Sequence, residues 1–179
     1  MNDLTLESVL RQRPNLSDDA ADLIVRAVAA RLDALHREGR VHADLRPATV
    51  RLAAEDDTVT ARIDDPVPAP KPMAPECLRG GTADARSDVF ALGVLACTVL
   101  TGQHPFRGKT DQEVELSTLS GRYGPLREIP DPMAAAIDGA LRVDPRHRTA
   151  NVTDFLALWT EGRPEPAADP ALIQAVKGG

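Results

Sequence analysis

The chain has 179 residues, 42% of them apolar and 27% charged, which suffices for one domain with a buried core. No apolar run approaches the ~18 residues of a membrane span, and the first residues lack the basic and apolar regions of a secretory signal. A formal net charge of −6 argues against a dedicated nucleic-acid binder, and two cysteines are too few for a disulfide scaffold. We therefore expect a cytoplasmic protein without nucleic-acid or membrane partners.

The first part of the chain predicts two helices. Leucine and valine recur at roughly helical spacing between residues 4 and 13, and a proline ends this segment. Ser17 is a favourable N-cap, and two aspartates follow it in the first turn, where carboxylates suit the helix dipole. An apolar stripe continues to residue 36, which predicts a helix of about 20 residues that Gly39 terminates.

The pattern then changes to short pieces rich in β-branched residues. Residues 49–52 and 59–63 are two such pieces with a polar turn between them, and together they predict a small β-hairpin. Prolines occupy every second position from residue 66 to residue 72. Because proline fixes φ and lacks an N–H group, this segment is expected to be an extended, stiff connector.

The second half of the chain is again helical in pattern. Residues 88–100 are apolar on nearly every face, which predicts a buried central helix closed by Gly102. Further helices are expected at residues 111–119, 132–141 and 152–159. The pattern divides the chain into one domain, residues 1–160, and a Pro-rich, mobile tail, residues 161–179, with one short helix at residues 170–176.

Several segments, in a fixed order, carry a resemblance to one family. Residues 35–47, which contain His42-Ala43-Asp44, resemble the catalytic loop of eukaryotic-like (bacterial Ser/Thr) protein kinases. The other matching segments are residues 62–64, 73–76, 87–94, 101–106 and 144–148. The resemblance implies a mostly α-helical fold like the C-terminal lobe of a kinase, with a small β-hairpin. The N-terminal lobe is expected to be absent, because the chain begins where a kinase has just crossed its hinge between the lobes.

The resemblance also assigns roles to particular residues. Asp44 matches the catalytic base and Asp64 matches a metal ligand, although for Asp44 we favour a role in bracing its own loop through backbone hydrogen bonds, since a base without positioned ATP has little to act upon. In the family, the residue that matches Asp88 bonds the backbone of the catalytic loop, and those that match Glu76 and Arg148 form a buried ion pair. The expected structural residues are His42, Glu76, Asp88, Gly93 and Arg148.

Departures from the family pattern concentrate at the nucleotide site. Thr49 stands where the second metal ligand, an asparagine, is expected, and Asp65 and Pro66 replace the Phe and Gly that follow the metal-binding Asp. Arg51 stands where the family has an apolar floor under adenine; a buried guanidinium there is costly unless it is paired, but it can also point into solvent. The glycine-rich loop and the strand lysine have no counterpart in the sequence.

These features favour a catalytically inactive, kinase-like protein (a pseudokinase) that acts as a scaffold or regulatory subunit and needs no cofactor. The alternative is a split Ser/Thr protein kinase that uses ATP and Mg²⁺ with a lobe supplied by a partner chain. A third interpretation is a gene fragment without a selected role. A protein partner, or a second copy in a homodimer, is expected to cover the face left bare by the missing lobe. The candidate contact residues are Arg46, Val50, Arg51, Leu52, Arg62 and Ile63.

Overall fold

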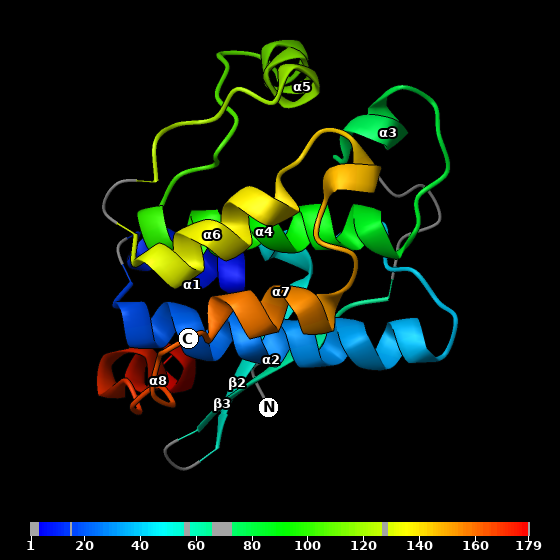
Figure 1. Cartoon of the computed structure of the whole chain (residues 1–179). Coiled ribbons are helices and arrows are strands. Elements are labelled where there is room, and N and C mark those ends of the chain that lie inside the picture. Colours follow the sequence, from blue (N-terminus) through cyan, green and yellow to red (C-terminus); the bar gives the residue numbers. More distant parts are fainter. Residues whose placement is uncertain (1–3, 15, 56–57, 66–72, 127–128, 179) are drawn as a thin grey trace.

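The computed structural model describes residues 4–14, 16–55, 58–65, 73–126 and 129–178, and more than half of these lie in helices (Figure 1). The helices are α1 (Leu6–Gln12), α2 (Asp18–Arg37), α3 (Pro75–Leu78), α4 (Ala85–Thr101), α5 (Asp111–Ser120), α6 (Asp131–Ala140), α7 (Val152–Trp159) and α8 (Pro170–Lys177). The remaining described elements are the 3-10 helices η1 (Pro47–Thr49) and η2 (Pro145–His147) and the strands β1 (Leu4–Thr5), β2 (Val50–Glu55) and β3 (Thr58–Ile63). The mostly α-helical class predicted from the sequence is confirmed.

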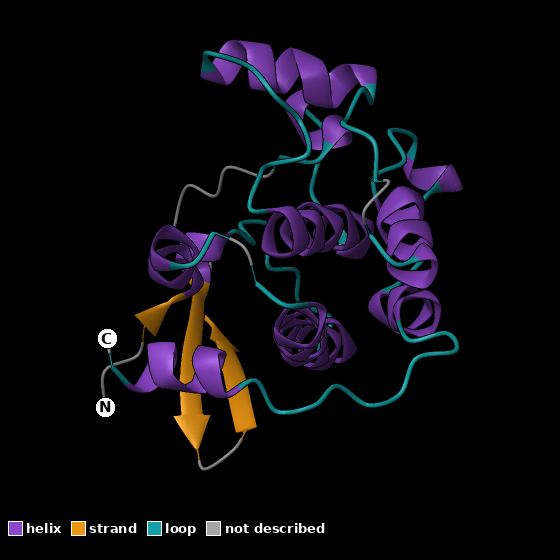
Figure 2. Cartoon of the chain, turned by 90° about the vertical axis from the view of Figure 1, so that its left-hand side faces the viewer, coloured by secondary structure: helices purple, strands orange, loops and turns teal. Residues whose placement is uncertain are grey.

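Helices α2 and α4 form the centre of the molecule. They pack against each other, and Figure 2 shows them nearly along their axes, with the sheet on one side and α6 and α7 on the other. Helix α4 has buried residues around most of its circumference, as the sequence predicted for a central helix. Its buried apolar residues are Val89, Phe90, Leu92, Leu95, Ala96, Cys97 and Val99. The core is therefore built around α4.

The ends of the two central helices are fixed by side chains that the sequence already shows. The hydroxyl of Ser17 accepts a hydrogen bond from the amide of Ala20 at the start of α2. The carboxylate of Asp84 accepts from the amide of Ser87 at the start of α4. Gly102 ends α4 in the left-handed region, with a φ of 67°, where glycine carries no steric penalty.

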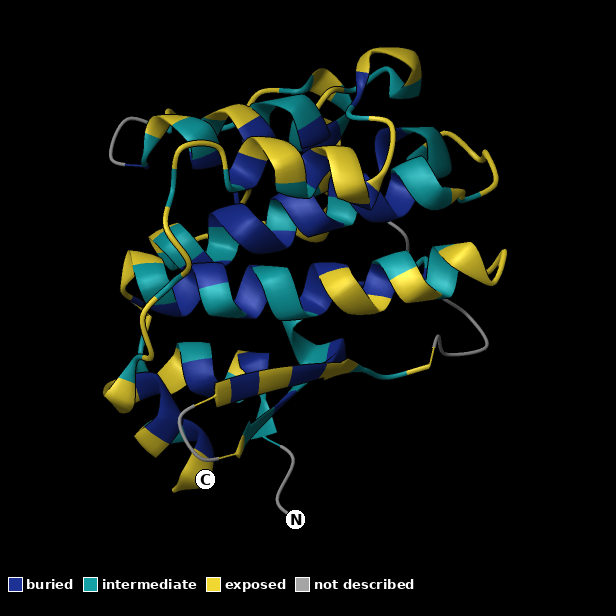
Figure 3. Ribbon diagram, turned by 60° about the horizontal axis from the view of Figure 1, so that its bottom comes forward, coloured by how far each residue is buried: buried dark blue, intermediate teal, exposed yellow. Residues whose placement is uncertain are grey.

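The three strands form an antiparallel sheet in the order β1–β2–β3. The predicted hairpin is present as β2 and β3, which pair Val50 with Ile63, and β3 alternates exposed and buried residues (Figure 3). Strand β1 is an addition to the prediction. Its Thr5 pairs with β2 and also caps α1 by accepting a hydrogen bond from the amide of Ser8, so the helix expected from residue 4 begins at Leu6.

The strand β2 is buried more deeply than the sequence suggested. Val50 and Leu52 have no exposed surface, whereas they were expected to belong to a face left open for a partner. Strands β1 and β3 flank β2, and α1 and α8 also pack against it. The expectation that these two side chains lie on an exposed face is therefore corrected: other elements of the same chain cover them.

The end of the chain is ordered into a helix where the sequence suggested a mobile tail. The short helix expected at residues 170–176 is present as α8, and it packs against β2. Three of its apolar side chains, Leu172, Ile173 and Val176, are buried. They recur at positions i, i+1 and i+4, which places them on one face of the helix, and the short length of the segment hid this pattern.

Two further observations complete the comparison with the sequence. The proline-rich connector, residues 66–72, lies outside the described residues. Among the helices of the described ranges, none combines the length and the apolar character that crossing a bilayer requires.

The close approach of α4 and α6 depends on one glycine. A Cβ atom placed on Gly93 would lie 2.6 Å from the Cβ of Ala140 and 3.3 Å from a methyl group of Leu141. We predict that Gly93→Ala lowers the free energy of unfolding by about 1–3 kcal/mol, because overpacking outweighs the usual gain of alanine in a helix. Urea denaturation measures this change.

A second substitution serves as the control for this contact. Adding Ala140→Gly to Gly93→Ala moves the methyl group from one helix to the other, and we expect it to recover part of the lost stability. A stabilising effect of Gly93→Ala alone would contradict the close approach of the two helices.

Candidate functional site

The loop that contains Asp44 is held by one carboxylate of the central helix. The side chain of Asp88 is fully buried, and it accepts hydrogen bonds from the amides of His42 and Ala43, each at 2.8 Å. The ring Nε2 of His36, in the last turn of α2, lies 2.8 Å from the same carboxylate. The expected contact between Asp88 and the loop backbone is present. The imidazole of His36 is a third hydrogen-bond partner of this carboxylate, which the sequence did not predict.

The backbone of this loop is strained at one position. Ala43 has a φ of 60°, and no other non-glycine residue in the described ranges has a positive φ. The left-handed region costs a residue with a Cβ atom about 1–2 kcal/mol. The hydrogen bond from its amide to Asp88 holds the peptide in this conformation. The sequence carried no signal for it, because alanine is not a residue that favours this region.

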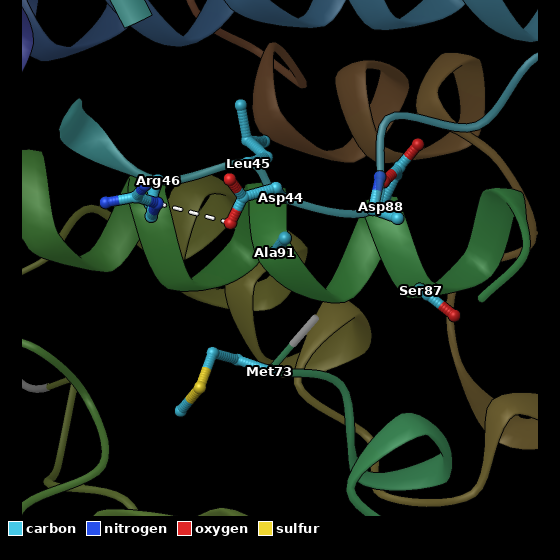
Figure 4. A pocket seen from close by; sticks show the side chains of 8 residues that line it. Asp44, Leu45, Arg46, Met73, Ser87, Asp88 and Ala91 are labelled. Carbon is cyan, nitrogen blue, oxygen red and sulfur yellow. Dashed lines mark hydrogen bonds and ion pairs between the residues drawn. The ribbon is translucent and has the colours of Figure 1, made fainter. Parts of the chain in front are cut away.

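Asp44 is buried and lines a small cavity next to α4. The cavity is lined by Ala43, Asp44, Leu45, Arg46, Met73, Ser87, Asp88 and Ala91, and Figure 4 shows their side chains. One carboxylate oxygen of Asp44 accepts a hydrogen bond from Nε of Arg46 at 3.2 Å. The other, Oδ2, is buried and has no hydrogen-bond partner within the described part of the chain. Within the described part of the chain, this carboxylate thus has one side-chain partner, Arg46, in place of the backbone hydrogen bonds expected of a brace.

His42 links this loop to the end of β3. Its Nε2 donates a hydrogen bond to the backbone carbonyl of Asp64 at 2.8 Å, and its Nδ1 accepts one from the amide of Asp44 at 3.2 Å. The imidazole is fully buried. Both ring nitrogens are therefore used in holding the backbone, which agrees with the structural role expected for His42.

Asp64 pairs with an arginine of the neighbouring strand. Nε of Arg51 donates to Oδ2 of Asp64 at 2.8 Å, and about a third of each side chain is exposed, 34% and 32% respectively. The amide of Asp64 donates to the carbonyl of Thr49 at 2.9 Å. Of the two options left open for Arg51, the structure has the paired one: the guanidinium is neutralised by the carboxylate expected to bind a metal.

The hydroxyl of Thr49 is occupied by local hydrogen bonds. Its Oγ1 accepts from the amide of Arg46 at 3.1 Å and lies 3.0 Å from the carbonyl oxygens of both Asp44 and Arg46. This side chain stabilises η1 and is buried. The oxygen is therefore held inside the loop. Among the described residues, no group of three or more His, Cys, Asp or Glu side chains could hold a metal ion.

A second ion pair joins α3 to the residue that follows η2. Nη1 and Nη2 of Arg148 bind the two carboxylate oxygens of Glu76, each at 2.8 Å, and Ser87 donates to the same carboxylate. The predicted contact between Glu76 and Arg148 is confirmed. The Arg148 guanidinium also donates to three backbone carbonyls and lies over the ring of Phe90, 5.0 Å from its centroid. This arginine joins α3, α4 and the loop before η2.

The environment of Glu76 favours its ionised form. Burial by itself raises the pKa of Glu76, but the hydrogen bonds from Arg148, a backbone amide and Ser87 outweigh burial and hold the pKa below its ordinary value. The carboxylate therefore stays charged in the folded protein to a lower pH than in the unfolded chain.

The candidate partner residues do not form one apolar surface. Arg46 is exposed on the loop, and Arg51 and Arg62 face each other across β2 and β3. Two like charges directly opposite one another repel, and the negative charge of Asp64 reduces this repulsion by neutralising the positive charge of Arg51. Ile63 is half-buried. The exposed part of this region is thus polar.

Comparisons with known proteins agree on one family. The model of the protein kinase domain matches residues 1–157. The serine/threonine-protein kinase PkaA of Streptomyces coelicolor is 31% identical over 176 residues, which cover 88% of this chain and 32% of that protein. PknL of Mycobacterium tuberculosis, also a serine/threonine-protein kinase, is 32% identical over 152 residues, 75% of this chain and 36% of that protein.

A mammalian relative and a solved structure give the same result. Ribosomal protein S6 kinase alpha-2 of Mus musculus is 30% identical, with 88% of this chain and 25% of that protein covered. The crystal structure of Rad53 1–466 in complex with AMP-PNP matches with a TM-score of 0.74 and 27% identity, over 85% of this chain and 42% of that one. The chain therefore spans a quarter to about a third of the length of these curated relatives.

The ion pair of Glu76 and Arg148 gives a first prediction for this region. Either Glu76→Ala or Arg148→Ala should lower the free energy of unfolding by about 3–5 kcal/mol, because each leaves a buried group without its partner. The double variant should lose less than the sum of the two. Arg146→Ala is the control: this arginine is exposed, and its loss should leave the unfolding midpoint nearly unchanged.

The same pair predicts a dependence of stability on pH. Because the pKa of Glu76 is lower in the folded than in the unfolded protein, its contribution is present above the ordinary value of 4.5 and is lost as pH falls through the folded value. Urea midpoints measured between pH 7 and pH 3 should therefore fall more steeply for the parent than for Glu76→Gln. Equal slopes would contradict the role of this carboxylate.

Relief of the strain at Ala43 is a separate prediction. Ala43→Gly should raise the free energy of unfolding by up to about 1 kcal/mol, since glycine adopts a φ near +60° without steric cost. Ala91→Gly, in the helix α4, is the control and should be destabilising. If Ala43→Gly destabilises the protein as much as the control, the backbone of this loop differs from the one described.

Proposed function

Because the chain belongs to the protein kinase domain family, we propose that it forms the C-terminal lobe of that fold and is catalytically inactive. It acts by binding another protein, as a scaffold or regulatory subunit. The family membership and the mostly α-helical fold support the first statement. In the described ranges the β-structure consists of the single three-stranded sheet, which supports the assignment to one lobe.

One observation carries the proposal of inactivity: the 2.8 Å ion pair between Arg51 and Asp64. In active members of the family, the matching aspartate binds Mg²⁺ that bridges the phosphates of ATP. Here the guanidinium of Arg51 donates a hydrogen bond to one oxygen, Oδ2, of the matching aspartate, Asp64. A divalent cation at the same oxygen would have to break the ion pair and would then face an unpaired positive charge at short range.

The other groups near this carboxylate also fit a magnesium ion poorly. The hydroxyl of Thr49 is held by the backbone of η1 and is a neutral, weak ligand. His42 uses both of its ring nitrogens on the backbone. The described residues around Asp64 therefore do not fit Mg²⁺.

A split kinase is the second candidate, and Asp44 is the observation that favours it. This residue matches the catalytic base of the family, its Oδ2 is without a hydrogen-bond partner in the described part of the chain, and the named relatives are serine/threonine-protein kinases. In this case a partner chain supplies the lobe that binds ATP, and Asp44 accepts the proton of the substrate hydroxyl.

Nucleotide binding by the chain alone tests the proposal of inactivity. We predict that Mg-ATP causes no saturable shift in the melting temperature of the chain, whereas a ligand at 100 times its Kd stabilises a protein by about 2.7 kcal/mol. Asp64→Ala serves as the matched control and should behave like the parent. A saturable shift that disappears in Asp64→Ala would overturn the proposal of inactivity.

Transfer of phosphate tests the split kinase directly. The protein is purified from its native host together with its partners, and incorporation of labelled γ-phosphate into protein is measured with the parent and with Asp44→Ala. Incorporation that depends on Asp44 establishes the second candidate. Its absence in a complex that contains a stably bound partner supports the scaffold.

A further inference from the structure

The last segment of the chain lies outside the family match but is built into the molecule. The protein kinase domain model ends at residue 157, whereas α8 lies at residues 170–177 and packs against β2. Leu172 is fully buried, and Ile173 and Val176 expose 7% and 4% of their surfaces. Beyond the family match, the chain therefore places a helix against one strand of the sheet. We call residues 160–177 the strap.

The strap is fixed at its beginning by a buried contact. The indole Nε1 of Trp159, the last residue of α7, donates to Oδ1 of Asp22 at 2.7 Å, and both side chains are fully buried. Arg26, one turn further along α2, donates to the same oxygen. The anchor thus belongs to the core of the molecule, and the strap leaves it at Thr160.

Beyond this anchor the polar contacts are exposed. Ser17 donates to Oδ2 of Asp169 at 2.5 Å, and Arg26 lies 3.2 Å from the carboxylate of Glu165, whose side chain is 86% exposed. Asp169 also caps α8 by accepting from the amide of Leu172. Water competes for such contacts, so they contribute little to holding the strap in place. These contacts favour one position of α8 but add little to the free energy that holds it there.

The strap has the features of a segment that opens without the rest of the molecule. Residues 163–169 contain neither helix nor strand, and α8 has only eight residues, too few for a stable helix on its own. Its order comes from the three apolar side chains that face the sheet. Segments with few buried contacts and exposed hydrogen bonds open locally at lower free energy than the core does.

Two arginines lie near the strap, although the first turn of α2 itself carries Asp18 and Asp19. Arg26, within α2, lies 3.2 Å from the carboxylate of Glu165. Burial raises the pKa of Asp169, but the hydrogen bonds from Ser17 and from the amides of Leu172 and Ala171 outweigh burial, and the charge of Arg13 lowers this pKa further. The contact between the strap and the rest of the molecule thus consists of an apolar strip with single pairs of opposite charge beside it, and a helix with an apolar face behind an acidic N-cap reproduces both.

We propose that the strap is a displaceable cover, and that the surface of the sheet beneath it is a binding site for the amphipathic helix of a protein partner. The helix that fits has apolar residues at positions i, i+1 and i+4 behind an acidic N-cap, as α8 has. The partner's helix replaces α8 after the strap opens, while Trp159 keeps the rest of the chain in place. This inference goes beyond the proposed function, since it holds whether or not the chain transfers phosphate.

Hydrogen exchange in the full chain tests whether the strap opens alone. We expect the amides of α8 to exchange through local opening, at rates that low concentrations of denaturant leave unchanged, at least 100-fold faster than those of α2 and α4. Leu172→Ser should accelerate exchange in α8 alone, and Gln174→Ser, at an exposed position of the same helix, should not. Exchange of α8 only by global unfolding would overturn the proposal.

A peptide in trans tests the site itself. A labelled peptide of residues 161–179 is titrated into the full-length parent, Leu172→Ser and Gln174→Ser, each first shown to be folded by circular dichroism. We expect Leu172→Ser to bind the peptide at least tenfold more tightly than the other two, and a peptide with Leu172→Ser not to bind. Failure of the folded variant to bind, or its global unfolding, would overturn the proposal. None of these measurements depends on nucleotide or on catalysis.

Discussion

The carboxylate of Asp88 organises the region around Asp44. It lies in the first turn of the central helix α4, has no access to water, and accepts hydrogen bonds from the amides of His42 and Ala43, with the imidazole of His36 at 2.8 Å. A charge buried so deeply is stable only with several donors. The loop is consequently shaped by the core rather than by its own residues, which is how an alanine is kept in a left-handed conformation.

Two pairs of arginine and carboxylate have opposite consequences in this molecule. Arg148 and Glu76 form a bidentate pair that joins α3 to the core, and the backbone carbonyls around the guanidinium complete its hydrogen bonds. Arg51 and Asp64 form a single contact near the surface, in which the guanidinium neutralises the carboxylate that was expected to bind a metal ion. The first pair ties α3 to the core, whereas the second is the contact on which the proposal of inactivity rests.

The sequence predicted those features that depend on local pattern. The bounds of α2, the burial of α4 and the hairpin followed from spacing and capping residues, and the contact between Glu76 and Arg148 followed from the family resemblance. Features that depend on packing between distant segments were missed. The burial of Leu52 requires β1 and α8, whose nearest residues, Thr5 and Pro170, are 47 and 118 residues away in the sequence. The pairing of Arg51 with Asp64 requires the register of the two strands.

The first and last described elements of the chain, β1 and α8, both lie against β2. The chain's own elements thus cover the apolar surface that a partner was expected to cover. The partner that we propose then has two routes of recognition: contact with exposed polar residues such as Arg46, or exchange of its own helix for α8. In the second route, the affinity that a partner shows is its intrinsic affinity reduced by the small fraction of molecules whose strap is open. A change that loosens α8 therefore strengthens binding at the sheet even though it removes a contact from the folded protein.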